Sequence, residues 1–307
     1  MTRRTAALLI LLLGLGGCAG PDKPDQPARS ATLPAGPTSP TGPTSAATSA
    51  TPTAAPARTF AVKQRELNFS RGADRPLETT VWYPADGDGP FPLVLFSHGL
   101  SSEPRAYASV LRPWARAGFV VAAPRYPHTA YRVREFDAVD VINQPADATE
   151  VITRVLALNR TPGDPLEGRI DTGRIAAAGH SAGGITTIGM FSGNRDDRLD
   201  AGIVLSGRRV LPVPFAGDPA PMLFVHGKLD RTVRYAEGLA AFDAVPWPKA
   251  MMAVTEGGHV AITKDFDPVI ATTTDFLRYA LYGDPAAKDR LKSDATDGRR
   301  ATLIDRL

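Results

Sequence analysis

Apolar and polar residues change their spacing along this chain, and each change marks a different kind of element. Residues 62–69 and 77–83 alternate apolar and polar side chains, the period of antiparallel strands at the edge of a sheet. After Pro84 the apolar residues form short continuous runs instead, typical of parallel strands covered on both faces. These runs are 93–96, 119–123, 175–178, 203–205, 222–225 and 250–254.

Amphipathic segments separate these runs, with apolar residues at three- and four-residue intervals. They span 104–117, 146–158, the residues after Ser181, 235–244 and 268–281. The alternation predicts an α/β fold with a doubly wound, mostly parallel sheet and helices on both faces. Because 206–220 is a short, Pro-rich connection, we expect no cap domain. Ligands of such sheets bind beyond the C-terminal ends of the strands.

The N-terminus has the pattern of an export signal. Arg3 and Arg4 precede an apolar run over 6–13 and small residues up to Cys18, and the run is too short to span a bilayer. Residues 15–18, Leu-Gly-Gly-Cys, resemble the lipobox of bacterial lipoproteins, in which the cysteine is acylated after cleavage. Cys18 is the only cysteine, so no internal disulfide can form. An ordinary secretory signal with an incidental cysteine is the alternative.

The resemblance implies removal of 1–17 and a lipid anchor at Cys18, on the extracytoplasmic side of the membrane in a bacterial cell envelope. Residues 18–58 are rich in Pro, Thr, Ser and Ala and predict a disordered tether. At roughly 3 Å per residue, this tether reaches up to about 100 Å. Residues 59–283 then form one α/β domain, and the charged residues 284–307 predict a peripheral helix or a frayed tail.

Charge adds little to this picture. The formal net charge is +3 with a sequence pI near 9.1, and basic residues are scattered among acidic ones, so we expect no nucleic-acid partner. No segment requires a partner subunit, and a monomer is favoured.

The chemistry centres on residues 179–184, Gly-His-Ser-Ala-Gly-Gly, which fit the Gly-x-Ser-x-Gly pattern. A buried apolar run precedes Ser181 and a helical pattern follows it, which is the context of a nucleophile on a strained turn. The small neighbours Gly179, Ala182, Gly183 and Gly184 suit such a turn. Taken alone, the motif also fits a Gly-rich packing turn with a solvated serine.

A serine nucleophile needs a base, and the chain has five histidines. His98 and His226 each end a predicted strand before a glycine, which favours structural roles. His180 lies inside the turn, and its side chain points away from that of Ser181. His259 follows the last strand in a Gly-Gly turn and is the preferred base.

Asp230 is the matching carboxylate, because it follows the strand 222–225 and the order Ser, Asp, His suits this architecture. Asp200 and Asp218 are weaker candidates, one at the wrong end of the sheet and the other in a Pro-rich connection. A turn or helix-cap aspartate is the alternative for Asp230.

Acyl transfer also needs N–H donors for the oxyanion, each worth about 3–4 kcal/mol. The amide of Ala182, next to the nucleophile, and that of Leu100, after the first central strand, are the expected donors. Candidate pocket-lining residues are Tyr126, His128 and Trp247.

These motifs together resemble the α/β-hydrolase superfamily. The segments are Phe-Ser-His-Gly-Leu at 96–100, 179–184, His-Gly-Lys-Leu-Asp at 226–230 and Gly-His at 258–259. Over about 60–282 the chain is similar to compact esterases such as dienelactone hydrolase, platelet-activating factor acetylhydrolase and chlorophyllase. The resemblance implies Ser181 as nucleophile, His259 as base and Asp230 as orienting acid, with no cofactor and no metal ion. The chain differs from dienelactone hydrolases proper, which use cysteine as the nucleophile, and from cutinase-like enzymes, which usually carry a disulfide.

The sequence therefore predicts a serine carboxylic ester hydrolase acting through an acyl-enzyme, on short-chain or exposed esters of a small molecule, a lipid or a polyester. Two alternatives stay open. One is an envelope lipoprotein that binds a lipid or cell-wall ligand on a hydrolase scaffold without turnover. The other is a serine peptidase of the same fold.

Overall fold

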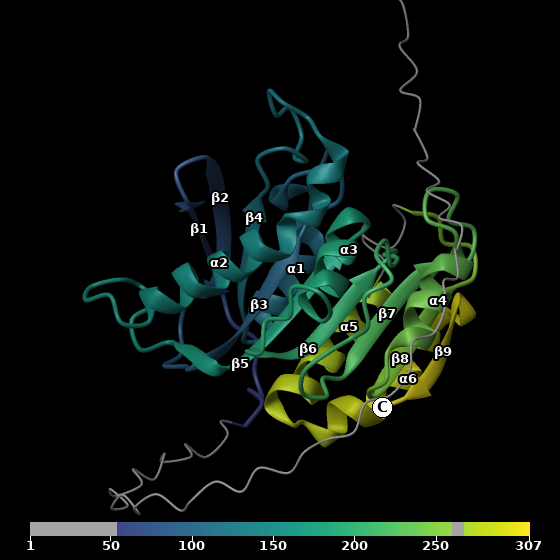
Figure 1. The fold of residues 1–307 in the computed structure, drawn as a ribbon. Helices are drawn as coiled ribbons and strands as arrows, with labels where there is room; N and C mark the ends of the chain where they lie inside the picture. Colours follow the sequence, from purple (N-terminus) through teal and green to yellow (C-terminus); the bar gives the residue numbers. More distant parts are fainter. Residues whose placement is uncertain (1–53, 260–266) are drawn as a thin grey trace, which may run out of the picture. The chain divides into compact units, whose positions relative to one another are not determined.

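A computed structural model describes residues 54–259 and 267–307 (Figure 1). The predicted signal, Cys18 and the tether up to residue 53 lie outside the described residues. The strands form one nine-stranded sheet in the order β1-β2-β4-β3-β5-β6-β7-β8-β9. Its strands are β1 (Val62–Arg71), β2 (Arg75–Pro84), β3 (Phe91–Ser97), β4 (Val120–Arg125), β5 (Ile170–His180), β6 (Leu199–Leu205), β7 (Met222–Gly227), β8 (Lys249–Val254) and β9 (Ala301–Arg306).

Strands β3 to β8 run parallel, so their C-terminal ends share one edge of the sheet. The pairs β1–β2, β2–β4 and β8–β9 are antiparallel. The helices are α1 (Ala108–Arg116), α2 (Gln144–Leu158), α3 (Ala182–Met190), α4 (Tyr235–Ala244), α5 (Asp267–Tyr282) and α6 (Pro285–Thr296), with 3₁₀ turns at η1 (Pro104–Tyr107), η2 (Ala138–Ile142) and η4 (Asp297–Arg299). Among the described residues, none of the helices is long and apolar enough to cross a membrane.

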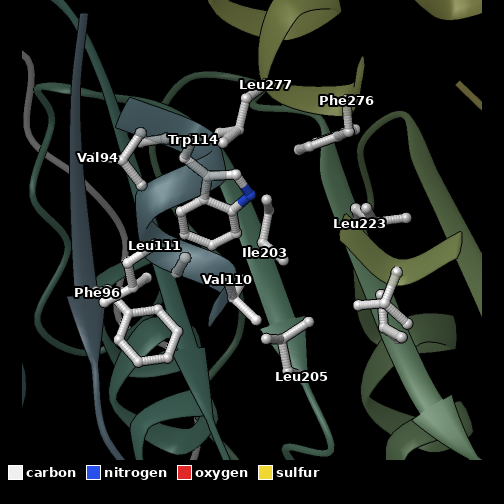
Figure 2. Packing of buried hydrophobic residues seen from close by; sticks show 14 of the residues in the cluster. Val94, Phe96, Val110, Leu111, Trp114, Ile203, Leu205, Leu223, Phe276 and Leu277 are labelled. Atoms are coloured by element: carbon white, nitrogen blue, oxygen red, sulfur yellow. The ribbon is translucent and has the colours of Figure 1, made fainter. Parts of the chain in front are cut away.

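Each face of the sheet has its own apolar core. Helices α1, α5 and α6 cover one face, where Trp114 packs between strand residues such as Val94 and Ile203 and α5 residues such as Leu277 (Figure 2). Helices α2, α3 and α4 supply the other core. The predicted α/β fold with a doubly wound, mostly parallel sheet and helices on both faces is therefore confirmed.

The connection from β6 to β7, residues 206–221, contains no helix in the described structure. The expectation that no cap domain is inserted there agrees with this observation. In the described residues, the connection after β6 therefore adds no layer of helices above the C-terminal edge of the sheet.

The C-terminal segment differs from the expected peripheral helix or frayed tail. Residues 285–296 form α6, but β9 then pairs with β8, from Lys249 opposite Arg306 to Val254 opposite Ala301. Only Ala301 of this strand is buried, and Asp305 and Arg306 are exposed, as suits an edge strand. So few buried apolar residues give the sequence little signal for a strand.

Candidate active site

Ser181 lies on the predicted turn, between the end of β5 at His180 and the start of α3 at Ala182. Its backbone is strained, with φ 56° and ψ −117°. A side chain at Gly179 would overlap the carbonyl of Gly183, so the strand and the helix can approach this closely only with glycine there. The glycines of the motif are therefore required by the geometry of the turn that presents Ser181.

The three residues predicted to carry the chemistry come together at the C-terminal edge of the sheet. His259, in the loop after β8, places Nε2 2.9 Å from Ser181 Oγ. Its Nδ1 lies 2.7 Å from Oδ2 of Asp230, in the loop after β7. Serine, imidazole and carboxylate thus form one continuous hydrogen-bonded chain, which we call the candidate triad.

Asp230 is held as an ionised, fully engaged carboxylate. Burial alone would raise its pKa, but hydrogen bonds from His259 and from backbone N–H groups outweigh burial and lower the pKa of Asp230. The backbone donors are Thr232 and Val233, at 2.8 and 2.9 Å from Oδ1. An ionised Asp230 accepts a hydrogen bond from the N–H at His259 Nδ1 and keeps the proton on that nitrogen, so Nε2 is free to accept the proton of Ser181.

The loops that carry Asp230 and His259 are themselves joined. The N–H of Leu229 donates to the carbonyl of Gly257 at 3.0 Å. A side chain at Gly227 would overlap that same carbonyl. Close packing of the two loops therefore fixes the spacing between the acid and the base.

Both predicted oxyanion donors lie beside the nucleophile. Ala182 is the first residue of α3, so its N–H has no acceptor within the helix. Leu100 follows Gly99, and a Cβ added at Gly99 would come within 3.2 Å of Ser181 Cβ. The turn bearing Leu100 therefore lies directly against the turn bearing Ser181.

Two further residues connect these parts: Tyr107, which the sequence does not single out, and His180, which it does not favour as the base. Tyr107 Oη accepts the N–H of Gly99 at 3.0 Å and lies 3.0 Å from His180 Nδ1. His180 Nε2 lies 2.9 Å from the carbonyl of His259.

The acceptors along these hydrogen bonds show which atoms of His180 and Tyr107 carry a proton. The His259 carbonyl needs a donor, so His180 carries its proton on Nε2, and Tyr107 donates its hydroxyl proton to Nδ1. Burial lowers the pKa of His180 to about 4, which keeps the ring in the neutral form that this arrangement needs. The contact between Tyr107 and His180 spans 73 positions, so no local pattern in the sequence marks it.

The remaining histidines have other surroundings. His98 is buried, accepts the N–H of Tyr126 at 3.1 Å, and has a pKa lowered to about 4 by burial. His226 lies 2.9 Å from the carbonyl of Val233, and burial lowers its pKa too. Both are buried, and His226 Nε2 also lies 3.5 Å from Oδ2 of Asp230, so this ring packs against the acid of the candidate triad.

The structure places only one of the three candidate pocket residues at the edge of the sheet that holds Ser181. Tyr126 is fully buried with Oη 2.8 Å from Ser97 Oγ, so it supports the sheet and does not line a surface. Trp247 precedes β8 at the opposite edge of the sheet and packs against Phe215. His128 is half-buried in the loop after β4, at the same edge as Ser181. The sequence does not show at which edge of the sheet an aromatic loop residue such as Trp247 lies.

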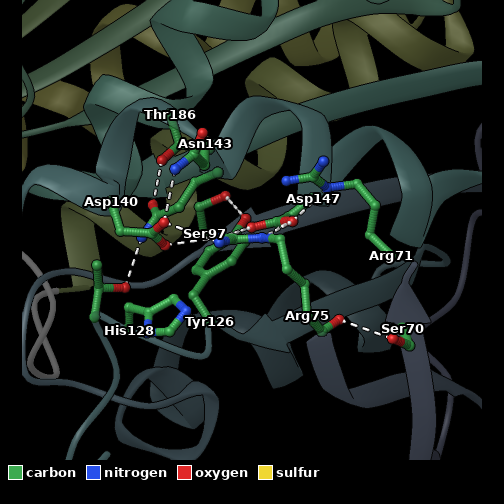
Figure 3. Close-up of polar contacts among 12 residues, drawn as sticks. Ser70, Arg71, Arg75, Ser97, Tyr126, His128, Asp140, Asn143, Asp147 and Thr186 are labelled. Atoms are coloured by element: carbon green, nitrogen blue, oxygen red, sulfur yellow. Dashed lines mark hydrogen bonds and ion pairs between the residues drawn. The ribbon is translucent and has the colours of Figure 1, made fainter. Parts of the chain in front are cut away.

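A second buried polar cluster lies beneath the loop after β4 (Figure 3). Arg75 of β2 forms a bidentate ion pair with Asp140 of η2, at 2.8 and 2.9 Å, and also binds Asp147 of α2. Arg71 binds Asp147 from the same hairpin at 2.7 Å. We call these four residues the arginine cluster, and it joins the β1–β2 hairpin to the segment that leads into α2. Among the described residues, no group of three or more His, Cys, Asp or Glu could hold a metal ion.

Comparison with known families agrees with the fold. A family model described as Chlorophyllase matches residues 55–206. The matched region runs from β1 to β6 and includes Leu100, Ser181 and Ala182, whereas Asp230 and His259 lie beyond it. The match indicates a hydrolase of the esterase type with an α/β-hydrolase fold. The search of curated proteins yields no match.

Proposed function

We propose that this chain, an α/β-hydrolase, is a serine carboxylic ester hydrolase that works through an acyl-enzyme intermediate. The observation that carries the proposal is the candidate triad, with 2.9 Å from Ser181 Oγ to His259 Nε2 and 2.7 Å from His259 Nδ1 to Asp230. A serine hydroxyl is a weak nucleophile until a neighbouring base removes its proton.

The reaction then has two halves. Ser181 Oγ attacks the ester carbonyl carbon while His259 Nε2 takes the serine proton, and the amides of Leu100 and Ala182 stabilise the oxyanion. Collapse of the tetrahedral intermediate breaks the ester C–O bond, and the alcohol leaves with the proton from His259. Water then attacks the carbonyl carbon of the acyl-enzyme while His259 takes a proton from it. Collapse of this second tetrahedral intermediate releases the acid, and His259 returns the proton to Ser181 Oγ.

The decisive experiment is labelling with an organophosphonate probe, which reacts with an activated serine. We expect stoichiometric labelling of the wild-type chain, loss of labelling in Ser181→Ala, and a loss of ester hydrolysis of about 10⁴-fold or more. Ser192→Ala, two residues beyond the end of α3, is the matched control and should keep both labelling and activity. Labelling that survives Ser181→Ala would overturn the assignment of the nucleophile.

The open edge of the sheet supports short-chain or exposed esters as substrates. Without a cap between β6 and β7, no helical layer encloses an acyl chain above Ser181 in the described structure. A series of p-nitrophenyl esters tests this, with acetyl and butyryl esters expected to outperform long chains and peptide anilides. Preference for long acyl chains would contradict the substrate class, and preference for anilides would indicate a peptidase.

Location in the cell envelope is the last part of the proposal. The lipobox-like residues 15–18 support acylation of Cys18, and the Pro- and Thr-rich segment after it supports a tether from the membrane to the domain. Mass spectrometry of the mature N-terminus tests the anchor. An unmodified Cys18, or cleavage elsewhere, would contradict it.

A further inference from the structure

The large hydrophobic residues that are exposed in the described structure are not scattered. Six of the eight follow the C-terminal end of β3, β4 or β7, at the edge that holds Ser181, and the other two, Val210 and Leu211, lie in the connection from β6 to β7. They are Leu100, Tyr131, Phe136, Val139, Ile142, Val210, Leu211 and Leu229. Single exposed apolar residues need no explanation, but their concentration at one edge does.

Five of them form what we call the apolar flank. It consists of Leu100 after β3, and Tyr131, Phe136, Val139 and Ile142 between β4 and α2. Val139 is 63% exposed and Phe136 51%. The two loops are joined by backbone hydrogen bonds of 2.8 Å, one from 101 to 129 and one from 131 to 102. The flank is therefore one surface that begins at the candidate oxyanion donor.

The loop that carries most of this flank is fastened from below. Asp140, next to Val139, is held by Arg75 of the arginine cluster (Figure 3). Gln144 Nε2 donates to Thr129 Oγ1 at 2.6 Å, which joins the end of the segment to its beginning. These buried contacts hold the backbone in place, so the apolar side chains stay exposed instead of folding into the core.

The opposite side of Ser181 has a different character, and we call it the basic flank. It consists of Lys228, Leu229, Arg231 and Arg234, which are all exposed in the segment that follows β7. The one acid within that segment, Asp230, is buried and bound to His259. Strand order places β7 two positions beyond β5, whereas β3 and β4 lie on its other side, so the two flanks border the candidate triad from opposite sides.

Basic side chains also accompany the apolar flank. Arg132 lies with its guanidinium carbon 4.9 Å from the ring centroid of Tyr131, and Arg134 is exposed near Phe136. The exposed acids of this loop are Glu135 and Asp137, and the Asp137 carboxylate accepts the N–H of Val139 at 2.8 Å. Elsewhere on the basic flank, Glu237 is shared between Arg208 and Arg234, whereas no ion pair joins Lys228 or Arg231 to an acid in the described structure.

We propose that this edge docks on the surface of an anionic lipid assembly. Exposed apolar tips next to basic side chains are the combination that enters the boundary between acyl chains and charged head groups. Docking would place Ser181 against the surface and let an ester pass from the lipid into the site without a cap. Only this last step rests on the proposed function, because the docking itself needs no catalysis.

Co-sedimentation with vesicles tests the docking. The parent protein is the full-length chain with Cys18→Ser, which removes acylation, and Ser181→Ala, which removes turnover. The vesicles consist of phosphatidylcholine alone or of phosphatidylcholine with an equal amount of the anionic lipid phosphatidylglycerol. We expect binding to be at least about tenfold tighter to the anionic vesicles, because each basic residue near the surface adds to the attraction. The attraction should fall as salt is raised.

Two variants separate the flanks. Phe136→Ser with Val139→Ser should weaken binding to anionic vesicles by about tenfold through lost apolar burial. Lys228→Glu with Arg231→Glu should remove most of the preference for anionic lipid. Lys63→Glu with Arg160→Glu, exposed charges at the opposite edge of the sheet, is the matched control and should bind as the parent does. Melting temperatures report whether each variant is folded.

Three results would overturn the proposal. The first is the absence of vesicle binding, and the second is equal binding to neutral and anionic vesicles. The third is self-association of the parent, seen in sedimentation without vesicles and abolished by the flank variants, which would make this edge an interface between copies of the chain. Hydrolysis of soluble esters by the chain with Ser181 intact tests the proposed function separately. An active chain that fails to bind vesicles refutes only the docking, and a docking chain that hydrolyses no ester refutes only the proposed function.

Discussion

Two buried polar clusters lie near the same edge of this sheet, and they use carboxylates in opposite ways. In the candidate triad, Asp230 binds His259, whose imidazole can take a proton from Ser181 and pass it on during a reaction. In the arginine cluster, Asp140 binds Arg75, whose guanidinium keeps its charge.

The partner therefore decides what a buried carboxylate does. An ion pair with arginine cannot transfer a proton, so it can only hold the chain in place, and here it holds the loop of the apolar flank. A carboxylate paired with histidine orients a group that can accept a proton from Ser181. The comparison predicts that substitutions in the triad change activity and those in the arginine cluster change stability.

The largest expected effect is that of Asp230→Asn on activity. The amide keeps the shape of the side chain but no longer favours a proton on His259 Nδ1, so we expect kcat to fall by about 10⁴-fold. Thermal unfolding should change far less than activity does. Loss of activity only in step with a lower Tm would show that Asp230 acts as a structural residue.

Next in size is the effect of Arg75→Met on stability. It leaves Asp140 and Asp147 buried without their main partner, and breaking such a pair costs about 3–5 kcal/mol at pH 7. Urea unfolding measures the loss, with Arg154→Met as control, because Arg154 pairs with Glu150 at the surface. Equal losses in the two variants would mean that burial of the cluster does not matter.

The pH dependence of that loss is the third test. Burial raises the pKa of Asp140, but hydrogen bonds from Arg75 and Asn143 outweigh it and lower the pKa below its usual 3.8. A depressed folded-state pKa stabilises the protein above the unfolded value and ceases to do so as pH falls through the folded value. The gap between wild type and Arg75→Met should therefore be widest above about pH 4 and narrow below it. A gap that widens on acidification would contradict the assignment.

The smallest effect on activity is expected from Tyr107→Phe. Removing the hydroxyl leaves the Gly99 N–H and His180 Nδ1 without their partner, which costs about 1–3 kcal/mol per buried group. Because both groups lie beside the nucleophile, part of that cost should appear as a fall in kcat of about tenfold with KM little changed. Tyr126→Phe removes an equally buried hydroxyl that bonds Ser97, and it should lower Tm without that kcat effect.

Strands and helices with strong periodicity were predictable from the sequence because local spacing carries the signal. The alternating residues before Pro84 form β1 and β2, and residues 235–244 form α4 at the predicted bounds. Position after a strand end was also enough to bring Ser181, Asp230 and His259 together, since parallel strands end at a common edge.

What could not be predicted depends on contacts distant in sequence. The link from Tyr107 to His180 and the pairing of Arg75 with Asp140 join residues 73 and 65 positions apart. Tyr126 and Trp247 have ordinary loop surroundings in the sequence. Neither the burial of Tyr126 nor the edge of the sheet at which Trp247 lies could therefore be inferred. Strand β9 was not predicted, because an edge strand needs few apolar residues and therefore leaves little pattern in the sequence.

That last strand has a consequence for how the protein is made. Residues 301–306 cover the edge of β8, whose backbone groups would otherwise be open to pairing with another chain. During synthesis β8 emerges about fifty residues before β9, as the spacing of Val254 and Arg306 requires. Until residues 301–306 have emerged from the ribosome, the edge of β8 is unpaired, so the growing chain is open to pairing with other chains at this strand.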